Sequence, residues 1–119
     1  MLKRILMLDD NPDILDVVKE ALLYEKFEVN ITTNEKNFME TIKRYRPDLV
    51  ILDYKLHAQK GNEICRQIKS HNGFDDIPVI ICSAYLNAGD VINCNCDAVI
   101  TKPFGLEELI GKVNGLVYN

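Results

Sequence analysis

The chain contains no apolar run long enough to cross a membrane. Its longest apolar runs are about four residues, whereas a helix needs roughly 20 to span a bilayer. The first residues, Met1 to Arg4, lead directly into a strand-like run and lack the apolar segment and cleavage site of a secretory signal. We therefore expect a cytoplasmic protein that has no membrane partner.

The chain also lacks an excess of basic residues. Among its 119 residues are 14 Lys and Arg against 18 Asp and Glu, so the formal net charge is -4. This balance disfavours direct binding to nucleic acid or to anionic membrane surfaces. No linker, repeat or low-complexity stretch divides the sequence, and its length suits one core. We expect a single domain over residues 1–119.

The four cysteines lack the spacing of a metal or redox motif. Cys94 and Cys96 are separated by one residue, whereas common motifs have two, and no pair of histidines completes a site. Cys82 lies in an apolar run, where a small buried residue is expected. We interpret the cysteines as reduced structural or incidental thiols, and His57 and His71, in polar loop-like sequence, as solvated.

Strand-like and helix-like stretches alternate along the chain. The strand-like runs are Ile5–Leu8, Phe27–Thr32, Leu49–Leu52, Pro78–Cys82 and Ala98–Thr101. The first, third and fourth are the most apolar, which indicates burial on both faces, whereas the second alternates and suits a sheet edge. Such alternation predicts an α/β fold, with a parallel sheet, right-handed crossovers and helices on both faces.

The sequence favours some of the expected helices more strongly than others. Asn11 and Pro12 are suited to start the first helix, whose expected core positions are Ile14, Val17, Val18, Ala21 and Leu22. Asn34 is a possible cap for the second helix, which Pro47 stops. The stretch Tyr85–Asn95 is the weakest, because glycine and several asparagines favour only a short or frayed helix.

Polar residues follow four of the five strand-like runs: Asp9 and Asp10, Asp53, Ser83, and Lys102. The carboxyl ends of parallel strands meet at one edge of the sheet, where ligands of such folds bind. Two carboxylates about 4 Å apart repel by about 4 kcal/mol at an effective dielectric of 20. The cluster therefore favours a cation, and its oxygen ligands suit Mg2+ or Mn2+ better than zinc.

Asp53 has two possible tasks at this edge. It is either a passive metal ligand or a nucleophile that attacks phosphorus and becomes an acyl phosphate, with Ser83 and Lys102 contacting the phosphoryl oxygens. Each residue alone also has an ordinary structural interpretation, as a helix cap, a turn residue or a surface lysine. Their joint occurrence at four strand ends makes coincidence a weaker explanation.

These residues resemble the receiver domain of two-component response regulators over essentially the whole chain. The matching features are Asp9-Asp10, Asp53 after an apolar strand, Gly61, Ser83-Ala84 and Lys102-Pro103-Phe104. The ordered set is specific, although no single member is. The resemblance implies a flavodoxin-like, doubly wound, five-stranded sheet with strand order 2-1-3-4-5.

The resemblance also implies a Mg2+ site and a phosphoacceptor. Asp53 would receive phosphate from a sensor histidine kinase or a phosphotransfer protein. Asp10 and Asp53 would bind Mg2+ through their side chains, Asp9 largely through water, and Lys55 through its backbone carbonyl. Such a domain is not an enzyme acting on external substrates; it catalyses only its own phosphorylation and dephosphorylation.

The resemblance further implies a switch. Ser83 would follow the phosphoryl group and Lys102 would ion-pair with it, changing the surface that controls a downstream partner or a fused output domain. A cis Lys102-Pro103 peptide bond is also implied. The chain departs from the family by carrying Val99 where an aromatic residue is usual. No effector domain follows Asn119, so we expect either a stand-alone receiver or a fragment of a longer regulator or hybrid kinase.

Three alternatives remain open from the residues alone. An aspartyl phosphohydrolase usually has a second acid two residues after its nucleophile, and here that position is Lys55. A binding module of the same fold that is never phosphorylated would not need Asp10, Asp53, Ser83 and Lys102 together. A flavin site is weaker still, because the loop after the first strand is acidic where a phosphate cradle needs Gly, Ser or Thr.

Overall fold

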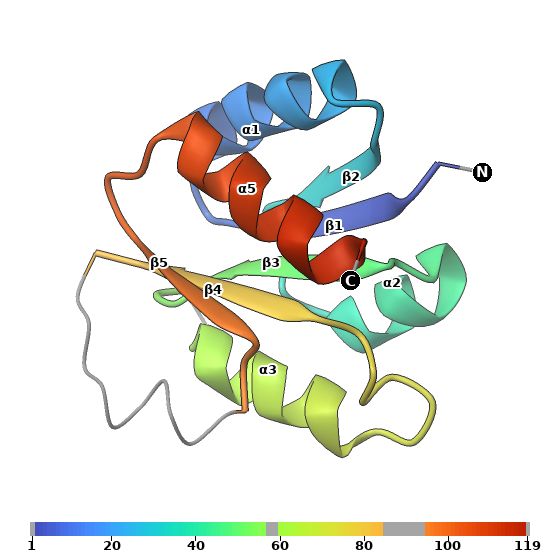
Figure 1. Cartoon of the computed structure of the whole chain (residues 1–119). Helices are drawn as coiled ribbons and strands as arrows, with labels where there is room; N and C mark the ends of the chain where they lie inside the picture. Colours follow the sequence, from blue (N-terminus) through green and yellow to red (C-terminus); the bar gives the residue numbers. More distant parts are fainter. Residues whose placement is uncertain (1, 57–59, 85–94, 119) are drawn as a thin grey trace.

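Five parallel strands form the centre of the protein. In the computed structural model, which describes residues 2–56, 60–84 and 95–118, the sheet has the order β2-β1-β3-β4-β5 (Figure 1). The strands are β1 (Arg4–Leu8), β2 (Glu28–Thr32), β3 (Leu49–Asp53), β4 (Val79–Ser83) and β5 (Ala98–Thr101). Every strand pairing is parallel. The predicted flavodoxin-like topology is confirmed.

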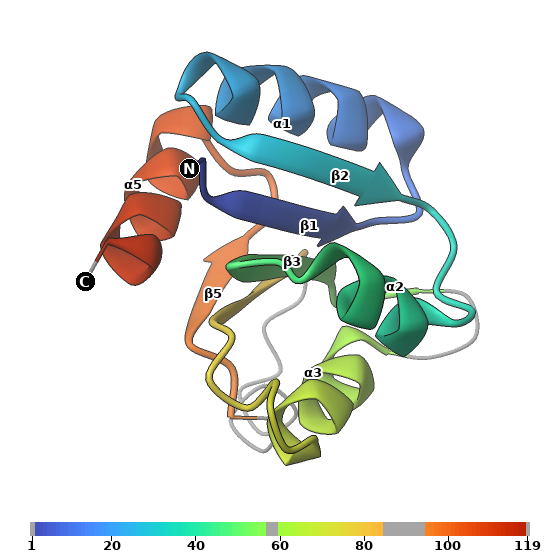
Figure 2. The same cartoon turned by 90° about the vertical axis from the view of Figure 1, so that its right-hand side faces the viewer.

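Helices cover both faces of this sheet. They are α1 (Pro12–Tyr24), α2 (Phe38–Tyr45), α3 (Gly61–Ser70) and α5 (Leu106–Val117). Figures 1 and 2 show α1 and α5 on one face and α2 and α3 on the other. No helix in the described part of the chain is long and apolar enough to cross a membrane. The weak helix expected over residues 85–95 falls almost entirely outside the described residues.

The two faces of the sheet have separate cores, which explains the continuous apolar runs in the sequence. Alternate residues of β1 point to opposite faces: Ile5 and Met7 pack with α1 and α5, whereas Leu6 and Leu8 pack with α2 and α3. All residues of β3 and β4 are buried. Each fully buried aliphatic side chain stabilises the fold by roughly 1.5–3 kcal/mol relative to exposure.

Helix α1 begins as predicted and buries Val18 and Leu22 as expected, but Leu15 rather than Val17 completes its buried stripe. The Asn11 side chain accepts hydrogen bonds from the backbone N–H groups of Asp13 and Ile14. The buried residues are Leu15, Val18 and Leu22, which fall on one stripe of the helix. Val17 lies on nearly the opposite side and is 53% exposed, so its predicted burial is wrong.

Helix α2 does not use the predicted cap. Its N-cap residue is Asn37, which has a left-handed backbone with φ of 58° and makes no side-chain cap hydrogen bond. The Asn34 side chain instead accepts a hydrogen bond from the backbone N–H of Lys36, two residues on. Asn34 therefore forms a local turn before the helix, as asparagine commonly does.

Candidate functional site

Three carboxylates converge where β1 and β3 end. Asp9 and Asp10 follow β1 directly, and Asp53 is the last residue of β3. Each contributes a carboxylate oxygen to a group whose members all lie within 4.8 Å of one another. Asp9 is fully buried and Asp53 is 6% exposed, while Asp10 lies closer to solvent. The predicted meeting of these side chains at one sheet edge is thus observed.

An ammonium group from the far end of the chain enters this acidic cluster. Lys102 follows β5, and its Nζ lies 2.9 Å from Asp9 Oδ2 and 3.1 Å from Asp53 Oδ1. Its backbone N–H donates a hydrogen bond of 2.8 Å to the Ser83 carbonyl, which fixes β5 beside β4 at this edge. The Lys102-Pro103 peptide bond is cis, as expected.

Burial and mutual repulsion set the electrostatics of the cluster. Desolvation, followed by the negative charge of Asp9, raises the pKa of Asp53 from 3.8 to about 6, although Lys102 opposes this rise. Burial alone would lower the pKa of Lys102, but its hydrogen bond to Asp9 and the charge of Asp53 raise it overall. One ammonium thus partly neutralises three carboxylates, and the site favours further positive charge.

The local backbone holds these side chains in place. Asp9 Oδ1 accepts the backbone N–H of Asn11 at 2.9 Å, which links the acidic pair to the start of α1. On the other side, the backbone N–H of Gly61 donates to the Tyr54 carbonyl at 2.7 Å. A Cβ atom at Gly61 would overlap the Asp53 carbonyl oxygen, so only glycine lets α3 start this close to β3.

The donor set fits a hard divalent cation. Carboxylate oxygens are the ligands that Mg2+ prefers, and two of these three are withdrawn from bulk water, where an additional positive charge is most stabilising. Lys55 lies in the loop after β3, is exposed, and forms an isolated bridge with Lys60. The expectation that its carbonyl completes the ligands stays a prediction.

Ser83 ends β4 and is almost fully buried, with 2% exposure. It lies one residue beyond Cys82, the register partner of Asp53, so it stands next to the end of β3. Cys82 is fully buried in the core, as predicted, and this burial raises the pKa of its thiol to about 12. His71 is exposed, as predicted, while His57 and Cys94 lie outside the described residues.

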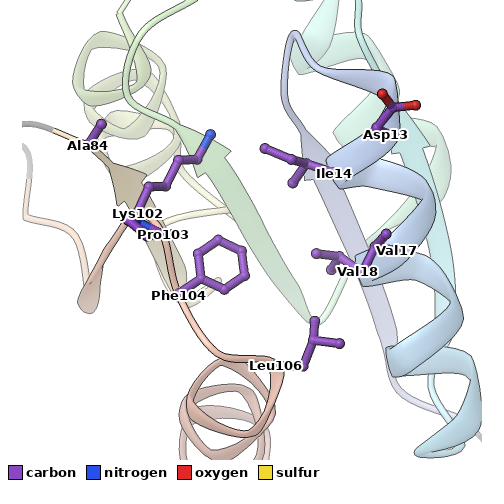
Figure 3. Close-up of a pocket in the computed structure, with 9 residues that line it drawn as sticks. All are labelled: Asp13, Ile14, Val17, Val18, Ala84, Lys102, Pro103, Phe104 and Leu106. Atoms are coloured by element: carbon purple, nitrogen blue, oxygen red, sulfur yellow. The ribbon is translucent and has the colours of Figure 1, made fainter.

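An apolar groove borders the acidic cluster. It has a volume of about 490 Å³ and lies between α1 and the connection from β5 to α5. Figure 3 shows Ile14 and Val18 of α1 facing Phe104, and Lys102, whose Nζ contacts Asp9 and Asp53, also lines the groove. Sequence reasoning missed this groove. The sequence held no clear signal for it, because Val17 repeats at helical spacing with Ile14 and Val18 and only the docking of α1 leaves it exposed.

The chain is similar in sequence and structure to response regulators. The family model for the response regulator receiver domain matches residues 5–114. Response regulator MprA from Mycobacterium leprae is 28% identical over 96% of this chain and 50% of its own length. The chain therefore spans about half the length of the curated relatives it matches.

Two solved structures extend this similarity. A CheY-like response regulator receiver domain protein from Methanospirillum hungatei superposes with a TM-score of 0.91 at 28% identity, covering 99% of this chain and 95% of that one. The response regulator TrrA from Thermotoga maritima, solved in complex with Mg2+ and BeF, gives a TM-score of 0.86 at 31% identity. That match covers 97% of this chain and 99% of the other.

Proposed function

The chain belongs to the response regulator receiver domain family, and from that premise we propose that its Asp53 carboxylate is phosphorylated in a Mg2+-dependent reaction. The observation that supports this most directly is the contact of one ammonium with two buried carboxylates at the sheet edge. Asp53 is the better acceptor of the two. Both oxygens of the fully buried Asp9 already accept bonds, from Asn11 and from Lys102, whereas Asp53 retains some exposure.

The reaction requires an ionised Asp53. With its pKa at about 6, most of the carboxylate is charged at neutral pH and can attack phosphorus. A bond then forms between an Asp53 oxygen and phosphorus, while the bond from phosphorus to the donor nitrogen breaks and its electron pair stays with the donor. Lys102, already beside Asp53, would pair with the phosphoryl oxygens, and the Ser83 hydroxyl would donate a hydrogen bond to one of them.

Asp10 and Asp53 would hold the metal through their side chains, Asp9 largely through water, and Lys55 through its carbonyl. The bound Mg2+, or Mn2+ in its place, would neutralise charge between the carboxylates and the incoming phosphoryl group. The chain's own carboxylates supply the oxygen ligands this requires. Because Lys55 stands where a phosphohydrolase has its second acid, the domain acts only on itself and does not turn over external substrates.

The phosphate donor would be a sensor histidine kinase or a phosphotransfer protein. The groove between α1 and the β5–α5 connection opens beside Lys102, so an apolar surface of the donor docked there would bring its phosphohistidine to Asp53. The added charge would then change the surface around β4 and β5 and control a downstream protein or a fused output domain. We expect this domain, over residues 1–119, to work in the cytoplasm without touching nucleic acid itself.

The test is intact-mass measurement after incubation with Mg2+ and acetyl phosphate. Wild-type protein should gain the mass of one phosphoryl group, and chelation of the metal should abolish the gain. Asp53→Asn should gain nothing. Asp48→Asn is the matched control, because Asp48 lies just before the other end of β3, is exposed, and should leave the gain unchanged. An unmodified wild type, or a full gain on Asp53→Asn, would refute the assignment.

A further inference from the structure

A hollow lies at the edge of the sheet opposite to the acidic cluster, and we call it the basic hollow. It has a volume of about 560 Å³ and lies between the end of α2 and the turn from α3 to β4, both at the right of Figure 1. Its described lining consists of Lys43, Arg46, Pro47, Gly73, Phe74 and Ile77. Binding sites for small molecules have volumes of about 300–1,000 Å³, so the basic hollow is large enough for such a ligand.

Two cationic side chains border the basic hollow. Lys43, in the last turn of α2, forms an exposed ion pair with Glu40 at 3.4 Å. Arg46 is the exposed C-cap residue of α2, and its guanidinium makes no hydrogen bond or ion pair with any residue in the ranges 2–56, 60–84 and 95–118. No acid is among the described residues that line the hollow. Arg46 can therefore accept an anion there without giving up an existing contact.

Arg46 also lines a smaller hollow of about 270 Å³, together with Leu2, Lys3, Arg4 and Asp48. The one acid in this set is already engaged, because Asp48 Oδ2 accepts a hydrogen bond of 2.8 Å from the Arg4 backbone N–H. The Lys3 ammonium forms no ion pair with any described residue. Cationic side chains thus lie on both sides of Arg46, although the chain as a whole has a net charge of -4.

The remaining wall of the basic hollow is apolar, and hydrogen bonds hold it in place. The half-buried Phe74 ring stacks with His71, with centroids 4.5 Å apart and an interplanar angle of 17°. The Phe74 carbonyl accepts the backbone N–H of Ile77 at 3.0 Å, and the Ile77 carbonyl accepts a bond of 2.8 Å from Lys69 Nζ on α3. An aromatic ligand would therefore meet an aromatic side chain whose position is already fixed.

We propose that the basic hollow binds a small anion that carries a flat aromatic group, such as a mononucleotide or an aromatic carboxylate. Arg46 pairs with the phosphate or carboxylate, because the planar guanidinium offers two parallel N–H donors to two oxygens. Pro47, Phe74 and Ile77 contact the aromatic part of the ligand. Because the hollow lies at the edge opposite to Asp53, this binding does not depend on the proposed phosphorylation.

The experiment records amide NMR spectra of the whole chain during titration with AMP and, separately, with benzoate. EDTA is present, so that no metal in the acidic cluster can hold the phosphate. At least one probe should cause saturable shifts of the Gly73 and Phe74 amides, at lower concentration than adenosine or inorganic phosphate, each of which lacks one half of the proposed ligand. A response to AMP alone would identify a nucleotide ligand, and a response to benzoate alone an aromatic acid. If neither probe shifts these amides, the proposal is overturned.

Arg46→Gly tests the cation without disturbing the backbone. Arg46 has a left-handed φ of 54°, which glycine adopts readily, so the melting temperature should be no lower than that of wild type. Ligand affinity should fall about tenfold, the low end of the range for a charged hydrogen bond, because Arg46 is exposed. Arg44→Gln is the matched control, since Arg44 is an exposed cation in the same helical turn that does not line the hollow. An unchanged affinity in Arg46→Gly, or an equal loss in both variants, would overturn the site.

Discussion

Asp53→Asn should make the metal-free protein more stable at neutral pH while abolishing its phosphorylation. The ionised Asp53 carboxylate is disfavoured in the folded state, because burial and the charge of Asp9 raise its pKa from 3.8 to about 6 despite the nearby Lys102. Asparagine has nearly the same shape as the carboxylate and carries no charge. The substitution therefore removes a repulsive and poorly solvated charge from the folded protein.

The magnitude follows from proton linkage. One pKa unit corresponds to 1.36 kcal/mol, so the interval between 3.8 and about 6 amounts to about 3 kcal/mol at pH 7. Imperfect hydrogen bonding of the new amide offsets part of this, since an unsatisfied buried polar group costs about 1–3 kcal/mol. We expect a net gain of up to about 2 kcal/mol, or up to roughly 10 °C in melting temperature for a domain of this size.

The electrostatic explanation also predicts how the stability of the wild type changes with pH. Because the folded-state pKa of this acid is raised, ionisation lowers the stability of the folded wild type as pH rises from about 4 to about 6, and the loss is complete above that range. The advantage of Asp53→Asn should therefore be largest at pH 7 and should be lost as pH falls towards 4, where mainly the cost of the imperfectly bonded amide remains.

Thermal unfolding in EDTA across this pH range measures the stability difference between Asp53→Asn and wild type. Asp16→Asn, on the exposed side of α1, serves as the control. This control should change stability by less than about 0.5 kcal/mol. A melting temperature of Asp53→Asn below wild type at pH 7, or a difference independent of pH, would refute this electrostatic account.

Three further substitutions, two of them with matched controls, test packing and charge at the site and at the opposite edge of the sheet. Gly61→Ala should cost at least about 2 kcal/mol in urea unfolding, because its Cβ meets fixed backbone, whereas Gly111→Ala, in open space within α5, should gain about 0.5–1 kcal/mol. Lys69→Met breaks a 2.7 Å ion pair with Asp97 and a hydrogen bond to the Ile77 carbonyl, so it should lower the free energy of unfolding by about 1–3 kcal/mol. Its control, Lys43→Met, breaks only an exposed ion pair and should change the free energy of unfolding by less than about 0.5 kcal/mol. Lys102→Met should lower the melting temperature in EDTA and increase the rise produced by adding Mg2+, and an unchanged Mg2+ response would contradict its role as the resident cation.

The sheet and the location of the site were predictable because each depends on a strong and simple physical signal. The run Leu49–Leu52 is apolar at every position, which suits only a strand covered on both faces, and β3 is indeed wholly buried. Once the sheet is parallel, the residues that follow its strands must share one edge. Residues as distant in sequence as Asp9 and Lys102 could thus be placed together without any knowledge of side-chain conformation.

The details that failed depend on geometry that residue type does not determine. Leu15 and Val17 are both apolar, and only the docking of α1 on the sheet decides that Leu15 is buried while Val17 borders the groove. Asn34 and Asn37 are both good capping residues by type, but the cap is set by where the backbone first becomes helical. The overlap of a Cβ at Gly61 with the neighbouring strand likewise needed coordinates.

The same burial that stabilises the sheet makes its functional edge unstable. The central strands are buried because helices cover both faces of the sheet. Asp53, the last residue of β3, therefore lies in a site where its charge costs about 3 kcal/mol. This cost is a substantial part of the roughly 5–15 kcal/mol that stabilises a typical domain. A group that brings positive charge to the site, or that moves the negative charge outward onto a phosphoryl group contacting Lys102 and Ser83, relieves part of that cost. If the proposed function holds, part of the free energy for metal binding and for switching is already present in the unphosphorylated fold, and substitutions that relieve the strain without a ligand should weaken both.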